Sequence, residues 1–211
     1  MNIRGFVERY GEPYSKALGI NLESGRNEEI VKWFLASILY AKPIRENAAT
    51  LTYRTFEDYG VLTADKILET GWDGLVKILD EGRYVRYDFS TATKLLNVFG
   101  TLKRDYSDLW QLYNAARDSR DLEERLKSLG KGIGDVTVAI FLRDMRSIWS
   151  KADPKPTQLV QKAMNELSIQ DLRLFSKQHG LDLVRLETAL LRLEKDFIRK
   201  GIKIDTVVYE T

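Results

Sequence analysis

The sequence predicts an all-α fold of many short helices joined by tight turns. Apolar residues recur at helical spacing through most of the chain, as with Ile30, Trp33, Phe34 and Ile38. The breaks between these stretches are short and contain glycine, proline, asparagine or aspartate, which commonly end helices. Residues typical of strands gather at 202–209, where we expect a short extended arm rather than part of a sheet.

The apolar stripes place the expected helices in order along the chain. They cover residues 6–18, 29–40, 44–59, 64–68, 72–79, 89–102, 107–116, 122–129, 135–150, 157–167, 170–177 and 184–198. The most rigid connection is Asp153-Pro154-Lys155-Pro156, because its two prolines forbid helix there. We therefore expect one lobe from residues 28–152 and a second lobe from residues 1–27 plus 153–211.

Composition limits the chemistry that the chain can perform. Its 33 Lys and Arg against 31 Asp and Glu leave a net charge of +2, so any nucleic-acid contact must come from a local patch. The absence of cysteine excludes thiol nucleophiles, zinc–thiolate sites and Cys-ligated iron–sulfur clusters. The single histidine, His179, precedes Gly180 and is expected in the last turn of a helix with its glycine cap.

Hydropathy favours a protein that is neither secreted nor embedded in a membrane. No apolar run approaches the roughly 18 residues that a membrane span needs, and the start of the chain lacks the pattern of a signal peptide. We therefore expect a soluble intracellular protein, in the cytoplasm or nucleoid if the source is prokaryotic.

The most informative motif is the glycine pair around Ile133, between two expected helices. Gly132 and Gly134 can adopt conformations that a Cβ forbids, while Ile133 points into the core. Bare backbone at the start of the second helix lets its amide groups approach a phosphate, with help from the helix dipole. Such contacts position a protein on DNA without selecting a base sequence. An ordinary glycine-rich loop between two helices is the alternative interpretation.

The segment Leu126-x-x-Leu129-Gly130-Lys131-Gly132-Ile133-Gly134-Asp135-Val136-Thr137-Val138-Ala139 resembles the hairpin of the helix-hairpin-helix DNA glycosylases, the endonuclease III superfamily. Residues 34–42 resemble an early family helix that ends in a DNA-contacting loop, and residues 82–84 and 90–96 resemble the helix before the hairpin. Together these matches span roughly residues 28 to 170.

The resemblance implies a particular architecture and partner. It predicts a six-helix, barrel-like lobe at 28–152 that carries the hairpin, and a second lobe built from the N- and C-terminal helices. The implied partner is double-stranded DNA with a lesion or a mismatch, bound by a monomer. The family's cluster cysteines are missing and no cofactor is expected. A monovalent cation held by the backbone of Gly132 and Gly134 is compatible with the resemblance.

The resemblance also implies a catalytic group. Asp153 lies 17 residues after Val136, close to the place of the family's catalytic aspartate. A carboxylate there would stabilise the oxocarbenium-like sugar and orient the attacking water. Because a proline follows Asp153, capping of the next helix is the alternative role, and the two roles are compatible.

Val136 occupies the position of the lysine with which bifunctional family members nick the strand, which predicts a monofunctional, hydrolytic enzyme. Val136, Ile140 and Arg143 lie about 180° from the main apolar stripe of their helix, so we expect them to form the wall of a base pocket. Two alternatives stay open: a DNA-binding module that has lost the chemistry, and a lyase that uses Lys131 or Lys151.

The remaining candidates come from three places. Lys131, Lys42 and Arg45 are expected to contact DNA, with Lys42 at the position where the family fills the gap left by a flipped base; plain phosphate binding is the alternative. Tyr84 and Tyr87 are candidates for the pocket or for the core, whereas Phe89 is expected to pack in the core. Asp135 suits a helix start but repels phosphate, so we interpret it mainly as a cap.

Overall fold

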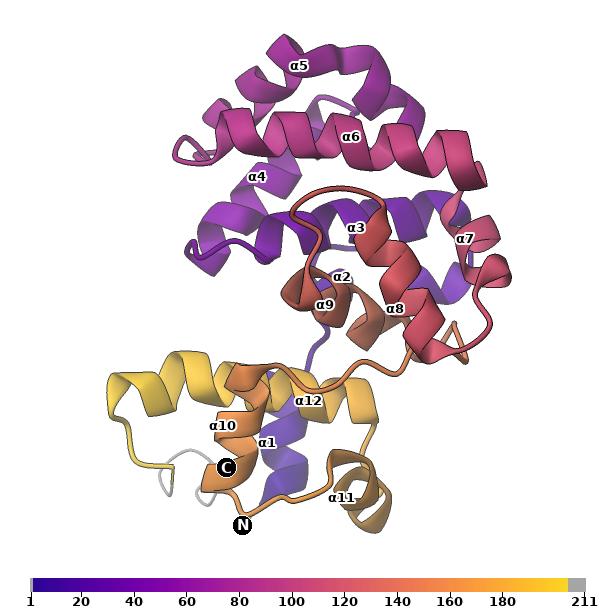
Figure 1. Ribbon diagram of the computed structural model, residues 1–211. Coiled ribbons are helices and arrows are strands. Elements are labelled where there is room, and N and C mark those ends of the chain that lie inside the picture. Colours follow the sequence, from indigo (N-terminus) through magenta and orange to yellow (C-terminus); the bar gives the residue numbers. More distant parts are fainter. Residues whose placement is uncertain (1, 205–211) are drawn as a thin grey trace. The chain divides into compact units, whose positions relative to one another are not determined.

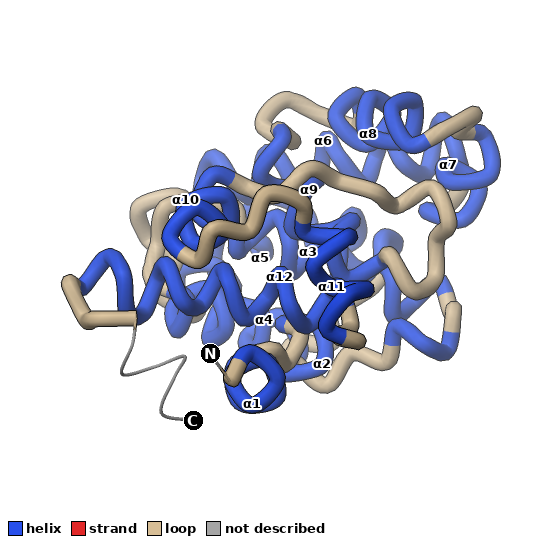
Figure 2. Tube along the Cα trace, turned by 90° about the horizontal axis from the view of Figure 1, so that it is seen from below, coloured by secondary structure: helices blue, strands red, loops and turns tan. Residues whose placement is uncertain are grey.

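The computed structural model describes residues 2–204, which form twelve α-helices and no strand (Figures 1 and 2). The expected all-α fold is therefore confirmed. Most of the extended arm expected at 202–209 lies outside the described residues. Over residues 2–204, no helix is both long enough and apolar enough to cross a membrane.

The chain divides into two compact units. Residues 20–154 form one, which we call the central unit, and residues 1–19 together with 155–211 form the other, the terminal unit. The divisions thus fall at 19/20 and 154/155, whereas the sequence analysis placed them at 27/28 and 152/153. Each unit is described separately below.

The central unit holds seven α-helices within its described range. They are α3 (Asn27–Tyr40), α4 (Glu46–Asp58), α5 (Ala64–Glu81), α6 (Asp88–Tyr106), α7 (Leu109–Ala115), α8 (Ser119–Ser128) and α9 (Asp135–Met145), preceded by a 3₁₀ turn at Leu22–Ser24. α5 and α6 run side by side, and α5 bends at Gly71, whose φ of 67° and ψ of 178° interrupt the helix (Figure 1). These angles lie outside the helical region, so the break that the sequence predicts at Gly71 is present, between two helical stretches of α5.

The core of the central unit is built around α3, which packs against α4, α7 and α9. Phe34 and Trp33 are fully buried, and the Phe34 ring meets Phe99 and Phe141 edge-on at 6.0 and 5.0 Å. Each such aromatic side chain contributes roughly 1.5–3 kcal/mol through burial. The Trp33 indole Nε1 donates to the Phe141 carbonyl at 3.0 Å, which satisfies the one polar atom of the ring and ties α3 to α9.

The terminal unit brings together segments from both ends of the chain. Its helices are α1 (Ile3–Tyr10), α2 (Tyr14–Ala17), α10 (Gln158–Glu166), α11 (Leu172–His179) and α12 (Leu183–Arg192), followed by a π turn at Leu193–Phe197 and a 3₁₀ turn at Ile198–Lys200. α1 packs on α12 (Figure 2), where Phe6 and Val7 meet Leu186 and Leu190 in one apolar cluster. α11 ends at His179 with Gly180 in the left-handed conformation, as the sequence predicts.

Several helix limits differ from the expected ones for local reasons. The helix expected at 6–18 is two helices, because α1 ends at Tyr10, just before Gly11, and α2 begins only after Pro13. The helix expected at 135–150 ends at Met145, after which the Met145 carbonyl accepts from both Ile148 and Trp149 in a tight turn. The periodicity survives this turn, so it could not mark where the helix stops.

Candidate nucleic-acid interface

The hairpin between α8 and α9 has the backbone that the sequence indicates. Gly132 has a φ of 91°, a conformation that favours glycine, and Ile133 is buried. The Ile133 amide donates to the Gly130 carbonyl at 3.1 Å, which closes the turn. A Cβ on Gly130 would come within 2.8 Å of Val98 Cγ2, so the lack of a side chain there lets the hairpin approach α6.

α9 begins at Gly134 without a side-chain cap. The first amide groups of a helix have no acceptor within it, and side chains or ligands usually supply one. A Cβ on Gly134 would meet nothing within 4 Å, so the backbone faces open space. Lys131, in the same turn, is exposed. This helix start combines open donors with a positive dipole, as anion sites on proteins do.

Lys94 of α6 reaches the hairpin from the side. Its ammonium Nζ donates to the Gly132 carbonyl at 3.0 Å, although only 9% of the residue is exposed. Burial, and then the positive charge of the neighbouring Lys42, lower the pKa of Lys94 to about 8. The Lys42 ammonium also lies 5.1 Å from the centre of the Tyr87 ring. Two lysines from different elements therefore converge on the hairpin.

These groups border a pocket of about 300 Å³, which we call the hairpin pocket. Its lining residues are Ala41, Lys42, Lys94, Gly132, Gly134, Asp135, Val136 and Thr137. Val136, which is 54% exposed, supplies apolar wall to this pocket.

Asp135 is turned toward a cation of its own hairpin. Its carboxylate lies 2.7 Å from Lys127 Nζ of α8 and is 88% exposed. The hydrogen bond to Asp135 raises the pKa of Lys127. This ion pair reduces the repulsion that Asp135 would exert on a phosphate at the start of α9. Asp135 caps no amide of α9, which differs from the capping role favoured by the sequence.

Asp153 is exposed on the irregular segment between α9 and α10, and it does not line the hairpin pocket. Its segment is fastened on both sides, since the Ala152 amide donates to the Trp149 carbonyl and Arg146 Nη2 donates to the Pro154 carbonyl at 2.7 Å. The helix that follows begins at Gln158 and is capped by Thr157. The alternative role of Asp153 as a helix cap is therefore wrong.

Two candidates, Arg143 and Phe89, lie elsewhere than expected, and Tyr84 takes the second of its two expected places. Arg143 is buried and its Nε donates to Asp144 at 2.8 Å, although Val136 on the same face of α9 is exposed. Tyr84 is buried and its hydroxyl donates to the Leu39 carbonyl at 2.8 Å, so it belongs to the core. Phe89, expected in the core, is 60% exposed and contacts Trp72 with ring centres 5.3 Å apart.

The other candidates differ in how close they come to the hairpin. Tyr87 is half-buried, with its ring between Lys42 and Arg86. Arg45 is exposed just before α4, and Ile140 is half-buried in α9. Neither of these two lines the hairpin pocket.

The two lysines considered for lyase chemistry have different surroundings. Lys131 is exposed in the turn of the hairpin. Lys151 Nζ instead donates to the carbonyls of Tyr113 and Ala116, at 2.7 and 2.5 Å, and lies over the Tyr113 ring. These bonds fix Lys151 as a structural cation.

Lys94 is the residue that sequence reasoning missed. It lies three residues after Thr91 and four before Val98, both of which are buried on α6. Lysine is rarely buried, so its presence among the core positions of a helix was the feature of the sequence that could have identified it as a candidate. The partner on the hairpin, 38 residues away, could not be inferred from helical spacing.

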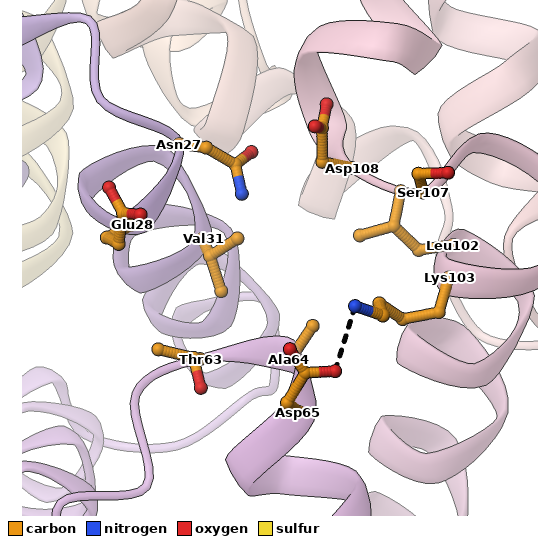
Figure 3. Close-up of a pocket in the computed structure, with 10 residues that line it drawn as sticks. All are labelled: Asn27, Glu28, Val31, Thr63, Ala64, Asp65, Leu102, Lys103, Ser107 and Asp108. Atoms are coloured by element: carbon orange, nitrogen blue, oxygen red, sulfur yellow. Dashed lines mark ion pairs between the residues drawn. The ribbon is translucent and has the colours of Figure 1, made fainter.

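A second pocket of about 170 Å³ lies where α3, α5 and α7 begin, and we call it the capped pocket (Figure 3). Two of the three helix starts are closed by side chains here, since Thr63 Oγ1 accepts from the Lys66 amide and Asp108 Oδ1 accepts from the Gln111 amide, whereas α3 has no side-chain cap. Lys103 Nζ reaches across to Asp65 at 2.8 Å. Its positive charge is thus paired within the pocket.

The chain matches no protein-family model, no curated protein and no solved structure.

Proposed function

We propose that the central unit binds double-stranded DNA by placing a backbone phosphate at the start of α9. The uncapped helix start at Gly134, beside Lys42 and Lys94, is the observation that carries this proposal. Phosphate is the anion that such amide groups and ammonium groups recognise together. Contacts of this kind are independent of base sequence, so we expect affinity to fall steeply with salt.

On this anchor we propose a DNA N-glycosylase that hydrolyses the bond between a damaged or mispaired base and its sugar. The resemblance of residues 126–139 to the helix-hairpin-helix glycosylases favours this chemistry. Asp153 is the proposed catalytic carboxylate, and its exposure leaves it accessible to a nucleotide flipped out of the duplex. Val136 lies where the resembling family carries its strand-nicking lysine. Because valine has no amine, we expect hydrolysis of the base–sugar bond without cleavage of the strand by this residue.

A non-catalytic DNA-binding module is the second candidate. The observation that favours it is the place of Asp153, which does not border the pocket beside the phosphate site.

An excision assay distinguishes the two candidates. The full chain is incubated with duplexes that carry uracil, mispaired thymine, 8-oxoguanine or alkylated adenine, and released base is measured beside DNA affinity. We expect release from one of these duplexes, and Asp153→Asn should lower it about 100-fold or more while affinity stays unchanged. Asp73→Asn makes the same chemical change on an exposed part of α5 and serves as the matched control.

Binding of all four duplexes without release of any base would support the non-catalytic module. Failure to bind duplex DNA at low salt would contradict both candidates.

A further inference from the structure

The hairpin pocket carries more positive charge than its own carboxylate balances. Lys42 and Lys94 both border it, and neither ammonium group has a carboxylate partner within residues 2–204. Asp135, the acidic residue among the lining residues, lies 2.7 Å from Lys127 Nζ and is therefore already paired. The ammonium groups of Lys42 and Lys94 are within hydrogen-bond distance of one another, so the fold holds two like charges together against their repulsion.

Thr137 of α9 is a further polar group of this pocket. The residue is only 3% exposed, it borders the pocket, and its hydroxyl makes no hydrogen bond with any residue that the structure describes. Buried hydroxyl groups normally have a partner, because leaving one without a partner costs free energy. Thr137 is also the third residue of α9, a helix of 11 residues whose first amides have no side-chain cap. Its hydroxyl and these amides can therefore serve the same ligand.

An anion with two negative charges suits this set of donors better than an anion with one. An internal phosphate of a DNA strand is a diester with a single negative charge. A phosphate at the end of a strand is a monoester, which carries a charge of about −1.5 to −2 at pH 7 and three free acceptor oxygens. Lys42, Lys94 and the start of α9 come from three different elements, so three separate donors face those three oxygens.

We propose that the hairpin pocket binds a phosphate monoester at the end of a DNA strand in preference to an internal phosphate, so that the central unit recognises a nick or a gap. This rests on the proposed function, because it specifies which phosphate of the DNA occupies the start of α9. The volume of about 300 Å³ lies at the lower end of the range for small-ligand sites, which suits one phosphate and its sugar. Val136, 54% exposed, is the apolar wall against which that sugar packs.

The test compares duplexes that differ in a single phosphate. The full chain is titrated, by fluorescence anisotropy at constant salt, with nicked duplexes that carry a 5′ phosphate, a 3′ phosphate or only hydroxyls, and with an intact duplex of the same sequence. We expect one of the two phosphorylated nicks to bind about tenfold more tightly than the hydroxyl nick, since it adds charge-assisted hydrogen bonds. The intact duplex should bind as the hydroxyl nick does.

The charge of the ligand supplies a second readout, the pH dependence of this preference. The second pKa of a phosphate monoester is about 6, so it becomes a monoanion at lower pH, whereas a diester keeps its single charge. The preference for the phosphorylated nick should therefore shrink from about tenfold at pH 7.5 to about twofold at pH 5.5. The charged lining residues, Lys42, Lys94 and Asp135, are common to both complexes. Their effect on general DNA affinity cancels in the ratio.

Three variants connect the preference with the pocket. Lys94→Met and Lys42→Met each remove one of the two charges and should reduce the preference to about twofold or less, with a smaller loss of affinity for the intact duplex. Thr137→Val keeps the shape of the side chain, removes its hydroxyl and should reduce the preference about threefold. Lys103→Met is the matched control, because it removes the same charge from the capped pocket, and it should keep the preference of the wild type.

A small probe separates this proposal from the proposed function. Phenyl phosphate is a monoester without DNA, and its binding is measured by isothermal titration beside that of dimethyl phosphate, a diester. Binding of phenyl phosphate alone, weakened in Lys94→Met, by a chain that bound no duplex would support the monoester site but make its source a free phosphate compound.

Equal affinity for the phosphorylated and hydroxyl nicks, in a chain that binds the intact duplex, would overturn the proposal and leave the proposed function standing. A preference that none of the three pocket variants reduces would also overturn it, as would a chain that binds neither the nicked duplexes nor phenyl phosphate.

Discussion

The hairpin pocket and the capped pocket both lie at helix starts of the central unit, yet their chemistry is opposite. In the capped pocket, Thr63 and Asp108 accept the first-turn amides and Lys103 pairs with Asp65. In the hairpin pocket, α9 begins on Gly134, which has no side chain to offer. From this difference we expect a helix start to bind an anion where no side chain caps its first amides and cations gather beside it, as Lys42 and Lys94 do at α9.

The largest effect is expected when α9 is given the side-chain cap that α5 and α7 have at the capped pocket. Gly134→Asp places a carboxylate where a Cβ has open space, at a φ of −114° that any residue adopts. The new side chain should accept the first-turn amides and repel phosphate, so DNA affinity should fall about 10- to 100-fold. The stability of the fold should stay equal or rise by a few tenths of a kcal/mol. Fluorescence anisotropy with a labelled duplex and urea unfolding measure the two effects.

Affinity equal to that of the wild type would show that phosphate does not use the start of α9. Gly201→Asp, in a turn of the terminal unit, adds the same charge away from the hairpin and is the control for net charge.

A smaller effect should appear in the pH dependence of stability. Below pH 8, Lys94 is charged in both the folded and the unfolded chain, and the folded state bears the cost of burying that charge. Between pH 8 and about 10.5 the folded state loses the proton while the unfolded state keeps it, so stability rises with pH. We expect a gain of about 1 kcal/mol over this window, since the ammonium keeps part of its hydration.

Lys94→Met removes this titration. Urea unfolding at several pH values should show the variant more stable than the wild type at pH 7.5, with the difference shrinking toward pH 10. A difference that is constant with pH would contradict the lowered pKa of Lys94.

The smallest effect is expected in the capped pocket. Lys103→Ala breaks the pair with Asp65, in which both side chains are largely exposed, so the free energy of unfolding should fall by less than about 1 kcal/mol. DNA affinity should change less than twofold, because this lysine has its own partner. A loss of affinity as large as that of Gly134→Asp would make the capped pocket a second contact with DNA.

Much of the fold could be predicted from the sequence because helices repeat locally. The all-α class, the break at Gly71 and the glycine cap after His179 all follow from residues within a few positions of one another. Some helix ends were harder, because a tight turn can interrupt a helix without interrupting its apolar spacing: α9 stops at Met145 although the spacing continues to Trp149.

The candidate site was predictable only in part. The glycines of the hairpin could be recognised in the sequence. A positive φ like that of Gly132 favours glycine over other residues. Periodicity cannot tell an open helix face from one covered by another element, and so Arg143 was misplaced. Lys94 was missed because its partners come from the turn after α3 and from the hairpin.

The division of the chain has a consequence for the order of folding. α1 packs against α12, and Arg192 Nη1 donates to the carbonyls of Tyr10 and Glu12 at 2.5 and 2.7 Å, about 180 residues away in the chain. The partners of Phe6 and Val7 on α12 are therefore synthesised only after residues 20–154. Residues 20–154 emerge earlier as a contiguous stretch and can fold during synthesis. The apolar face of α1 therefore stays unpacked during synthesis, and accessible to chaperones, until α12 has been made.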